Sequence, residues 1–387
     1  MPAIRLQTFL ILTALACSMP AFCVSPSTTP AKAVVAYVFP QNNALQPGEI
    51  DAQSLTRINY AFANIQDGRI VPGFAKDAEN FAFLLSLKRQ NPSLTVLVSV
   101  GGWLWSTNFS DVSLTPQSRD VFIDSVMEFL TRYKLDGLDI DWEYPGMPGA
   151  GHPFRAEDKQ NFTLLLKELR ARFDAETAKT HRRLYLTIAA GASDEFLDHT
   201  EMAQVQRYLD TVNLMAYDYY EPSSDAITGH HAPLFTNPDD PKKVSSDASV
   251  QAFEKAGVPA TKILLGLPFY GHMWGQVADR NHGLYQPGKP VPNGYSNYGA
   301  ITANMLGQGF DRYWDAKASV PYLYSPTKQI FVSYEDPESI AVKCNYVLDR
   351  KLGGVMFWDY EGDPSGALLR AIQDSLHTHK TESVPKK

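Results

Sequence analysis

Apolar and polar residues alternate along this chain with two different periods. Short apolar runs rich in β-branched and aromatic residues recur between amphipathic stretches, in which apolar residues fall three or four positions apart. The runs predict eight strands, over residues 34–39, 57–64, 95–101, 137–142, 184–190, 211–217, 263–269 and 353–358. The amphipathic stretches predict helices between them, which include residues 78–89, 117–133, 157–173, 246–255 and 337–348.

This alternation is typical of an α/β protein in which helices join parallel strands. Eight strand–helix units are the number that a closed (β/α)8 TIM barrel needs, so we predict that residues 34–375 form one catalytic barrel. One connection is too long for the pattern. Residues 271–321, between the seventh strand and its helix, contain strand-like pieces separated by Gly, Pro and Asn, and predict a small α+β insertion lobe beside the barrel mouth. A merely decorative loop is the alternative.

The fourth predicted strand carries acidic residues where a buried strand normally has none. In the segment LDGLDIDWEYP (135–145), Asp139, Asp141 and Glu143 share one face, while apolar residues occupy the other. Their α-carbons span only about 13 Å, at roughly 3.3 Å per residue. Burial and mutual repulsion both raise the pKa of such carboxyl groups, so at least one is expected to remain a proton donor near neutrality. A solvated edge strand, the alternative, does not account for the apolar face.

Composition and charge narrow the possible partners. A hydrophobic content of 44% is sufficient for a sizeable core. The formal net charge of −7 and the lack of a Lys/Arg cluster argue against a nucleic-acid partner. The 19 Tyr, 20 Phe and 6 Trp can supply platforms that stack on sugars, although most aromatic residues in any chain are core. Nothing indicates an obligate partner, and we expect a monomer.

The N-terminal residues have the composition of an export signal. Arg5 precedes an apolar run over residues 9–16 and a group of small residues, which predicts a signal peptide over residues 1–23 and a spacer over 24–33. The run is too short to span a bilayer, and no later segment is suitable, so we expect a secreted or periplasmic protein without a membrane span. Lipidation at Cys17 is the disfavoured alternative, because the preceding residues fit a lipoprotein site poorly. Residues 376–387 form a polar tail.

Five motifs give the chain a more specific resemblance. They are DGLDIDWEYP (136–145), SVGG (99–102), MAYDYY (215–220), GLPFYG (266–271) and GGVMFWDYEGD (353–363), and each falls at a predicted barrel strand. In this order they resemble the strand motifs of family 18 glycoside hydrolases, and especially of bacterial-type chitinases, over nearly all of the mature length. In this resemblance Ser99, Gly101 and Gly102 match the third-strand motif.

The resemblance implies a retaining mechanism in which the acetamido group of the substrate is the nucleophile. Glu143 would protonate the glycosidic oxygen and then, as a base, activate water to open the oxazolinium intermediate. Asp141 would hold the acetamido N–H, and Asp139 would share a proton with it. Tyr217 would donate its hydroxyl to the acetamido carbonyl oxygen. Asp136, which points the opposite way, is expected to brace the strand.

The resemblance also implies a set of substrate contacts. Asp218 would contact the same sugar, Met215 would pack beneath it, and Trp358 would form the floor of the cleavage subsite. Further contacts are expected from aromatic residues near strand ends, each of which could equally be packing: Tyr37, Trp103, Trp105, Tyr144, Tyr270 and Trp274.

Two departures from the family pattern affect the cleft. His272 stands where an Arg often follows the seventh-strand glycine, and Tyr219-Tyr220-Glu221 replaces a common arrangement of small residues and Trp. These differences put sugar contacts on that side in doubt. The neighbouring His230 and His231 should diverge on an extended chain, and we expect no metal and no cofactor.

The sequence therefore predicts a secreted chitinase that cleaves β-1,4 bonds between N-acetylglucosamine residues of chitin or chito-oligosaccharides. One alternative is a chitin-binding lectin of weak activity, against which Glu143 argues. Another is an endo-β-N-acetylglucosaminidase that acts on N-glycans or cell-wall glycans through the same acetamido-assisted step. The preference for chitin comes from the family resemblance alone.

Overall fold

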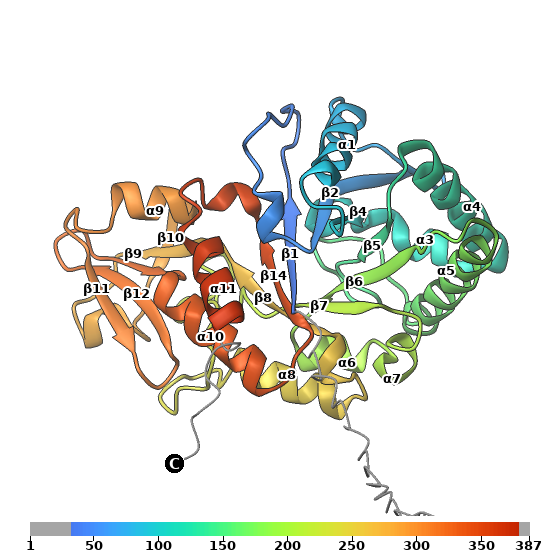
Figure 1. The fold of residues 1–387 in the computed structure, drawn as a ribbon. Coiled ribbons are helices and arrows are strands. Elements are labelled where there is room, and N and C mark those ends of the chain that lie inside the picture. Colours follow the sequence, from blue (N-terminus) through green and yellow to red (C-terminus); the bar gives the residue numbers. More distant parts are fainter. Residues whose placement is uncertain (1–31, 379–387) are drawn as a thin grey trace, which may run out of the picture. The chain divides into compact units, whose positions relative to one another are not determined.

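The computed structural model describes residues 32–378, in which eight parallel strands close into a barrel (Figure 1). Closure is shown by β1, which pairs in parallel with both β2 and β14. The barrel strands are β1 (Ala33–Val38), β2 (Arg57–Gln66), β4 (Thr95–Gly101), β5 (Gly137–Asp141), β6 (Tyr185–Gly191), β7 (Thr211–Met215), β8 (Ile263–Pro268) and β14 (Gly354–Trp358). The predicted TIM barrel is confirmed. A ninth strand, β3 (Arg69–Val71), forms an antiparallel extension of β2.

Helices surround the barrel, as the amphipathic stretches predicted. The long helices are α1 (Asp77–Ser86), α4 (Pro116–Tyr133), α5 (Asp158–Thr180), α8 (Ser246–Lys255), α10 (Pro337–Asp349) and α11 (Ala367–Thr378). Shorter ones are α2 (Gly102–Trp105), α3 (Phe109–Leu114), α6 (Asp194–Asp198) and α7 (Met202–Val205). Helix α4 begins after Thr115, which forms a capping box with Ser118, and Pro116 is its first residue. Helix α10 begins in the same way, with Asp336 as the cap and Pro337 as the first residue.

The two faces of β5 separate the core from the interior of the barrel. Leu138, Ile140 and Trp142 point outward and belong to the main hydrophobic core between the sheet and the helices. Asp139 and Asp141 lie on the opposite face, and they are in register with Ser99 and Gly101 of β4. The alternation inferred from the sequence is therefore present, and it directs the acidic side chains toward the barrel axis.

The insertion after β8 is an antiparallel sheet with one short helix. Its strands are β9 (Tyr270–Gly275), β10 (Lys289–Asn297), β11 (Asp311–Asp315), β12 (Val320–Ser325) and β13 (Ile330–Ser333), in the order β10-β9-β13-β12-β11, together with α9 (Tyr298–Asn304). The lobe was predicted over residues 271–321, but it extends beyond residue 321. Strands β12 and β13 complete the sheet, because β13 pairs with β9 and joins it to the β12–β11 hairpin.

Several sequence expectations concern the ends of the chain. The signal peptide over residues 1–23 and the spacer over 24–33 lie wholly or almost wholly outside the described residues, as does most of the tail over 376–387. Within residues 32–378, none of the helices combines the length and the apolar character that crossing a bilayer would need.

Candidate active site

A cleft of about 1180 Å³ opens at the carboxyl ends of the barrel strands. Residues at or beyond the ends of β4, β5, β7 and β14 line one part of it, and residues of the lobe strands β9 and β10 line another. Strand ends of this kind carry the catalytic groups in TIM barrels. The cleft lining includes these predicted site residues: Tyr37, Gly101, Trp103, Trp105, Asp141, Glu143, Tyr144, Met215, Tyr217, Asp218, Tyr270 and Trp358.

Asp139 lies below the cleft and is completely buried. Its carboxylate accepts hydrogen bonds from Tyr37 Oη (2.8 Å), Ser99 Oγ (2.8 Å) and Asn213 Nδ2 (3.1 Å), and also from the Thr187 hydroxyl. Burial raises the pKa of Asp139, while these donors oppose the rise. The predicted motif residue Ser99 therefore orients the deepest of the three acids.

Asp141 has a different environment from Asp139 although it lies only two residues further along β5. Its side chain is buried, and its Oδ1 has no hydrogen-bond partner among the described residues. Burial raises the pKa of Asp141 well above its usual range, and the negative charges of Glu143 and Asp139 raise it further. A buried carboxyl without donors favours its protonated form, so Asp141 is the acid on this strand that is most resistant to ionisation.

Glu143 follows β5 directly and faces the cleft while remaining 9% exposed. Burial raises the pKa of Glu143 to about 7; the hydrogen bond with Tyr144 opposes this change, and the charges of Asp218 and Glu221 add to it. A carboxyl group with this pKa is partly protonated at neutral pH and can serve first as an acid and then as a base. The spacing of the three acids had predicted such a group.

Ser106 helps to hold the end of β5, a role that no motif in the sequence indicated. Its hydroxyl accepts the backbone N–H of Glu143 (2.9 Å), and its Oγ lies 3.1 Å from the carbonyl oxygen of Asp141 and 2.9 Å from that of Gly102. Gly101 also has a close neighbour, because a β-carbon there would lie 2.2 Å from the Asp141 carbonyl oxygen. Ser106 thus links Gly102 of the third-strand motif to the backbone that carries Asp141 and Glu143.

Residues after β7 form the opposite side of the cleft. Burial raises the pKa of Tyr217 well above its usual range, so this phenol keeps its proton and is available as a donor. Asp218 adopts a left-handed backbone conformation (φ 59°) and accepts hydrogen bonds from Tyr270 Oη (2.7 Å) and His272 Nε2 (2.8 Å). Burial acts to raise the pKa of Asp218, but the imidazoles of His231 and His272 outweigh it, and the pKa lies well below its usual range.

Aromatic rings surround the carboxyl groups. Trp358, at the end of β14, stacks on Phe62 with ring centroids 5.4 Å apart and also contacts Tyr37. Trp103 is 50% exposed and lies edge-on to Tyr144. The sequence did not single out Tyr295, which lines the cleft from β10, is 50% exposed and stacks on Tyr270 with centroids 4.7 Å apart. Its position depends on strand pairing within the lobe, so no local motif could have revealed it.

Two predicted residues lie away from the cleft. Trp274 was expected to be a sugar platform, but it is fully buried in the core of the lobe and donates its Nε1 proton to the carbonyl oxygen of Asp225. It lies on β9 beyond Tyr270 and His272, where it packs edge-on against Phe331. Asp136 lies before β5 and accepts hydrogen bonds from Lys88 Nζ (2.5 Å) and Val96 N (2.8 Å), which agrees with the expected bracing role.

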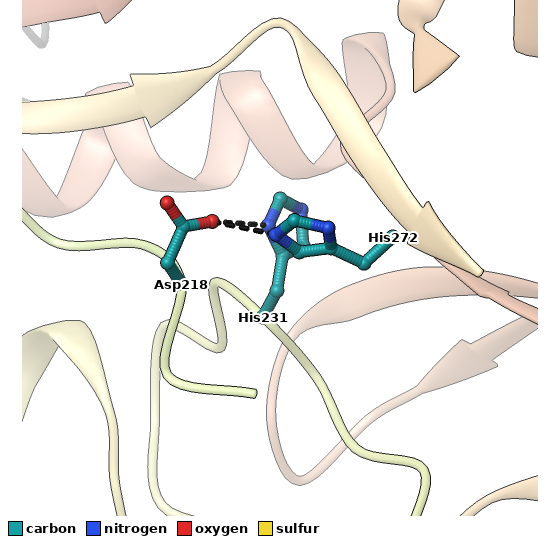
Figure 2. Close-up of side chains that lie close together, drawn as sticks. All are labelled: Asp218, His231 and His272. Atoms are coloured by element: carbon teal, nitrogen blue, oxygen red, sulfur yellow. Dashed lines mark hydrogen bonds and ion pairs between the residues drawn. The ribbon is translucent and has the colours of Figure 1, made fainter. Parts of the chain in front are cut away.

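Two histidines approach Asp218 from different segments (Figure 2). His230 and His231 do diverge as expected, because His230 Nε2 lies 3.0 Å from Asp315 in the lobe whereas His231 Nδ1 lies 3.6 Å from Asp218 Oδ1. His272 reaches the same oxygen from β9. The ligand atoms of Asp218, His231 and His272 all lie within 4.8 Å of one another, a grouping that the sequence analysis, which expected no metal, did not foresee.

Comparison with known proteins shows what the chain is similar to. The family model described as "Glycosyl hydrolases family 18" matches residues 33–363. Chitinase A1 of Niallia circulans is 36% identical, over 86% of this chain and 56% of its own length, so the chain spans little more than half of that relative.

Two solved structures are also similar over most of this chain. A family 18 N-acetylglucosaminidase from Paenibacillus barengoltzii is 42% identical with a TM-score of 0.82, covering 89% of this chain and 99% of its own. A mutant class V chitinase from Nicotiana tobaccum in complex with NAG4 is 30% identical with a TM-score of 0.81, with the same two coverages.

Proposed function

Because the chain belongs to family 18 of the glycosyl hydrolases, we propose that it is a chitinase that hydrolyses β-1,4 bonds between N-acetylglucosamine residues with retention of configuration. The observation that carries this proposal is the position of Glu143. It combines a pKa of about 7 with a place in the cleft, directly after the strand that bears Asp139 and Asp141. The names of several relatives support chitin as the substrate.

In the proposed mechanism, the first step needs no enzyme nucleophile. Ordinary retaining glycosidases place two carboxyl groups about 5 Å apart, one as acid and one as nucleophile. Here the acetamido oxygen of the sugar attacks C1 while the Glu143 carboxyl group gives its proton to the departing glycosidic oxygen. The Glu143 carboxylate then takes a proton from water, and the resulting hydroxide equivalent attacks C1 and opens the oxazolinium ring.

Asp141 and Asp139 would act on the acetamido group as a pair. The four donors around Asp139 favour its ionised form, whereas Asp141 lacks donors and favours its protonated form. When an acetamido N–H approaches, Asp141 must accept a hydrogen bond and therefore give up its proton, and Asp139 is the neighbouring base that can share it. The ionised Asp141 then stabilises the positive charge that develops on the oxazolinium ring.

The opposite side of the cleft would hold and orient the sugar. The Tyr217 hydroxyl keeps its proton and would donate to the acetamido carbonyl oxygen, which directs that oxygen toward C1. Asp218 would accept a hydrogen bond from a sugar hydroxyl, and Trp358 would stack under the ring with Met215 beside it. Tyr295 would add a second aromatic surface at the rim.

A second candidate activity is release of single N-acetylglucosamine residues, favoured by the 42% identity with the Paenibacillus enzyme. The lectin alternative conflicts with a cleft that retains Glu143. Action on N-glycans or cell-wall glycans remains the other hydrolase alternative. We further propose that residues 1–23 direct export of the protein and are then removed as a signal peptide, and that the mature protein acts as a monomer.

The product profile from chitohexaose tests these activities together. Purified wild-type protein is incubated with the hexamer, and products are followed by mass spectrometry from the first few per cent of conversion. Dimers, trimers and tetramers support the chitinase, whereas monomer and pentamer as the first products support the N-acetylglucosaminidase. An intact hexamer, together with cleavage of a glycoprotein N-glycan, would replace the proposed substrate class.

A further inference from the structure

Two imidazoles from distant segments meet at one carboxylate oxygen of Asp218. Asp218 follows β7, His231 belongs to the connection before α8, and His272 lies on β9. His272 Nε2 is 2.8 Å and His231 Nδ1 is 3.6 Å from Asp218 Oδ1. In a tetrahedral zinc site with bonds of about 2.0–2.2 Å, ligand atoms lie roughly 3.3–3.6 Å apart. The three side chains can reach that arrangement with shifts of about 1 Å, because all their ligand atoms already lie within 4.8 Å.

His231 is the unusual member of this group. Its side chain is completely buried, and neither of its ring nitrogens has a hydrogen-bond partner among the described residues. An unsatisfied buried polar group of this kind destabilises the fold, and most buried polar groups avoid that cost by forming hydrogen bonds. Nδ1 is directed at Asp218 from 3.6 Å, which is too far for a hydrogen bond but leaves space for an ion bound between the two atoms (Figure 2).

The three side chains are of types that bind metal ions when they are deprotonated, namely two imidazoles and one carboxylate. His272 can ligate through Nε2 once the proton on that atom has moved to Nδ1, which replaces its hydrogen bond to Asp218.

We propose that Asp218, His231 and His272 bind one divalent transition-metal ion, with Zn²⁺ as the best match, and that the bound ion blocks the cleft by withdrawing Asp218 from the sugar. Imidazole and carboxylate together suit zinc, whereas Mg²⁺ and Ca²⁺ prefer sites made of oxygen ligands. Three protein ligands leave a fourth position for water or a ligand.

The fourth position is accessible from the substrate side. Asp218 and His272 line the cleft, and 35% of the Asp218 side chain is exposed, so an ion can enter without unfolding of the lobe. Glu221 Oε1 lies 4.0 Å from His272 Nε2 and can approach as an additional ligand. The binding of the ion stands independently of the enzyme's activity, but inhibition rests on the proposed sugar contact of Asp218.

Direct binding is measured first, on chelator-treated wild-type protein. Titration calorimetry should give one Zn²⁺ per chain, and Co²⁺ should give the visible absorption bands of a tetrahedral nitrogen–oxygen site. His231→Gln and His272→Gln should each weaken Zn²⁺ binding at least about tenfold, since even groups that only support a ligand have effects of that size. His282→Gln is the matched control, because His282 is an exposed histidine that stacks on Tyr313 in the lobe.

Wild-type affinity in both His231→Gln and His272→Gln would overturn the proposal. So would a Zn²⁺-soaked wild-type crystal without an anomalous scattering peak among the three side chains, and that measurement does not depend on how well a variant folds.

Inhibition is then tested as the ratio of kcat/KM on chitohexaose without and with Zn²⁺. The ratio should rise with Zn²⁺ in the wild type and in His282→Gln but stay near one in His272→Gln. If neither the wild-type protein nor any variant cleaves chitohexaose, the proposed function fails. The binding measurements still decide whether the metal site exists.

Discussion

The two sides of the cleft hold carboxyl groups whose pKa values move in opposite directions. On the β5 side, burial raises the pKa of Asp141 and Glu143, and neighbouring negative charges add to the effect. On the β7 side, the more exposed Asp218 receives hydrogen bonds from Tyr270 and His272, and its pKa falls. The hydrogen-bonding and charged neighbours of a carboxyl group, and not burial alone, set its pKa. They therefore determine which side of the cleft carries protonated carboxyl groups and which side carries an ionised one.

The difference in carboxyl pKa between the two sides of the cleft matches the proposed chemistry. A proton donor is needed where the glycosidic bond breaks, and a stable hydrogen-bond acceptor is needed where the sugar is held. Replacing a carboxylate by the corresponding amide on each side of the cleft in turn tests this difference directly.

Glu143→Gln should lower kcat on a chromogenic chitobioside by about 10³-fold or more, because an amide cannot supply the proton that the leaving oxygen needs. Binding of chitotetraose, measured by titration calorimetry, should remain. Glu221→Gln is the matched control at the cleft rim and should change kcat less than about tenfold. Turnover of Glu143→Gln close to that of the wild type would remove Glu143 from its proposed role.

Asp141→Asn should slow substrates with an acetamido group by about 10²–10³-fold, which is the usual effect of losing one group that stabilises transition-state charge. The same substitution at Asp218 should act mainly on KM, because Asp218 is proposed to hold the sugar and not the developing charge. Steady-state kinetics on chitotetraose separate the two effects. Equal losses of kcat in both variants would contradict the difference between the two sides.

The pH dependence of kcat/KM should show the acid limb of Glu143. Since the pKa of Glu143 is raised to about 7, the proton donor is present below that pH and is lost above it. Activity should therefore fall roughly tenfold for each pH unit above about 7, as expected for one essential protonated group. A flat profile up to pH 9, measured with a substrate whose leaving group needs protonation, would be inconsistent with this assignment.

Stability should change in opposite directions on the two sides. The folded-state pKa of Glu143 is raised from 4.5 to about 7, so ionisation destabilises the fold as pH rises through this interval, and the cost above pH 7 is about 3 kcal/mol at most. Glu143→Gln should therefore raise the free energy of unfolding at pH 8 and have little effect at pH 4.

Asp218 has a lowered pKa, so its ionised form stabilises the fold above its unfolded pKa and that contribution is lost as pH falls. Asp218→Asn should consequently lower the free energy of unfolding at pH 7. Urea titrations at pH 4, 7 and 8 measure both effects. A gain in stability for both amide variants at neutral pH would mean that burial alone controls the carboxyl groups.

The β5 side could be predicted from sequence because its information is local. Asp139, Asp141 and Glu143 lie within five residues, and the period of two places them on one face once the segment is recognised as a strand. The barrel could be predicted for a similar reason, since each strand has its own apolar run. Raised carboxyl pKa values then follow from spacing and burial.

The β7 side could not be predicted because its contacts join distant segments. His231 reaches Asp218 from the connection before α8 and His272 reaches it from the lobe, so their meeting depends on tertiary structure. The same reason explains the error at Trp274. It lies on the same strand as Tyr270 and His272, and only its packing against Phe331 shows that it belongs to the lobe core.

The junction between barrel and lobe has a consequence for how such a cleft can diversify. A single residue, Phe269, separates β8 from β9; its N–H donates to the Trp358 carbonyl, and its own carbonyl accepts from Tyr298 at the start of α9. The near edge of the lobe is thereby tied to the barrel by main-chain bonds that do not depend on side-chain identity. The far hairpin is formed by β12 and β11, which lie two and three strands away from β9 in that sheet, and none of its described residues lines the cleft. Insertions at that hairpin can therefore enlarge the lobe while the groups that line the cleft keep their positions.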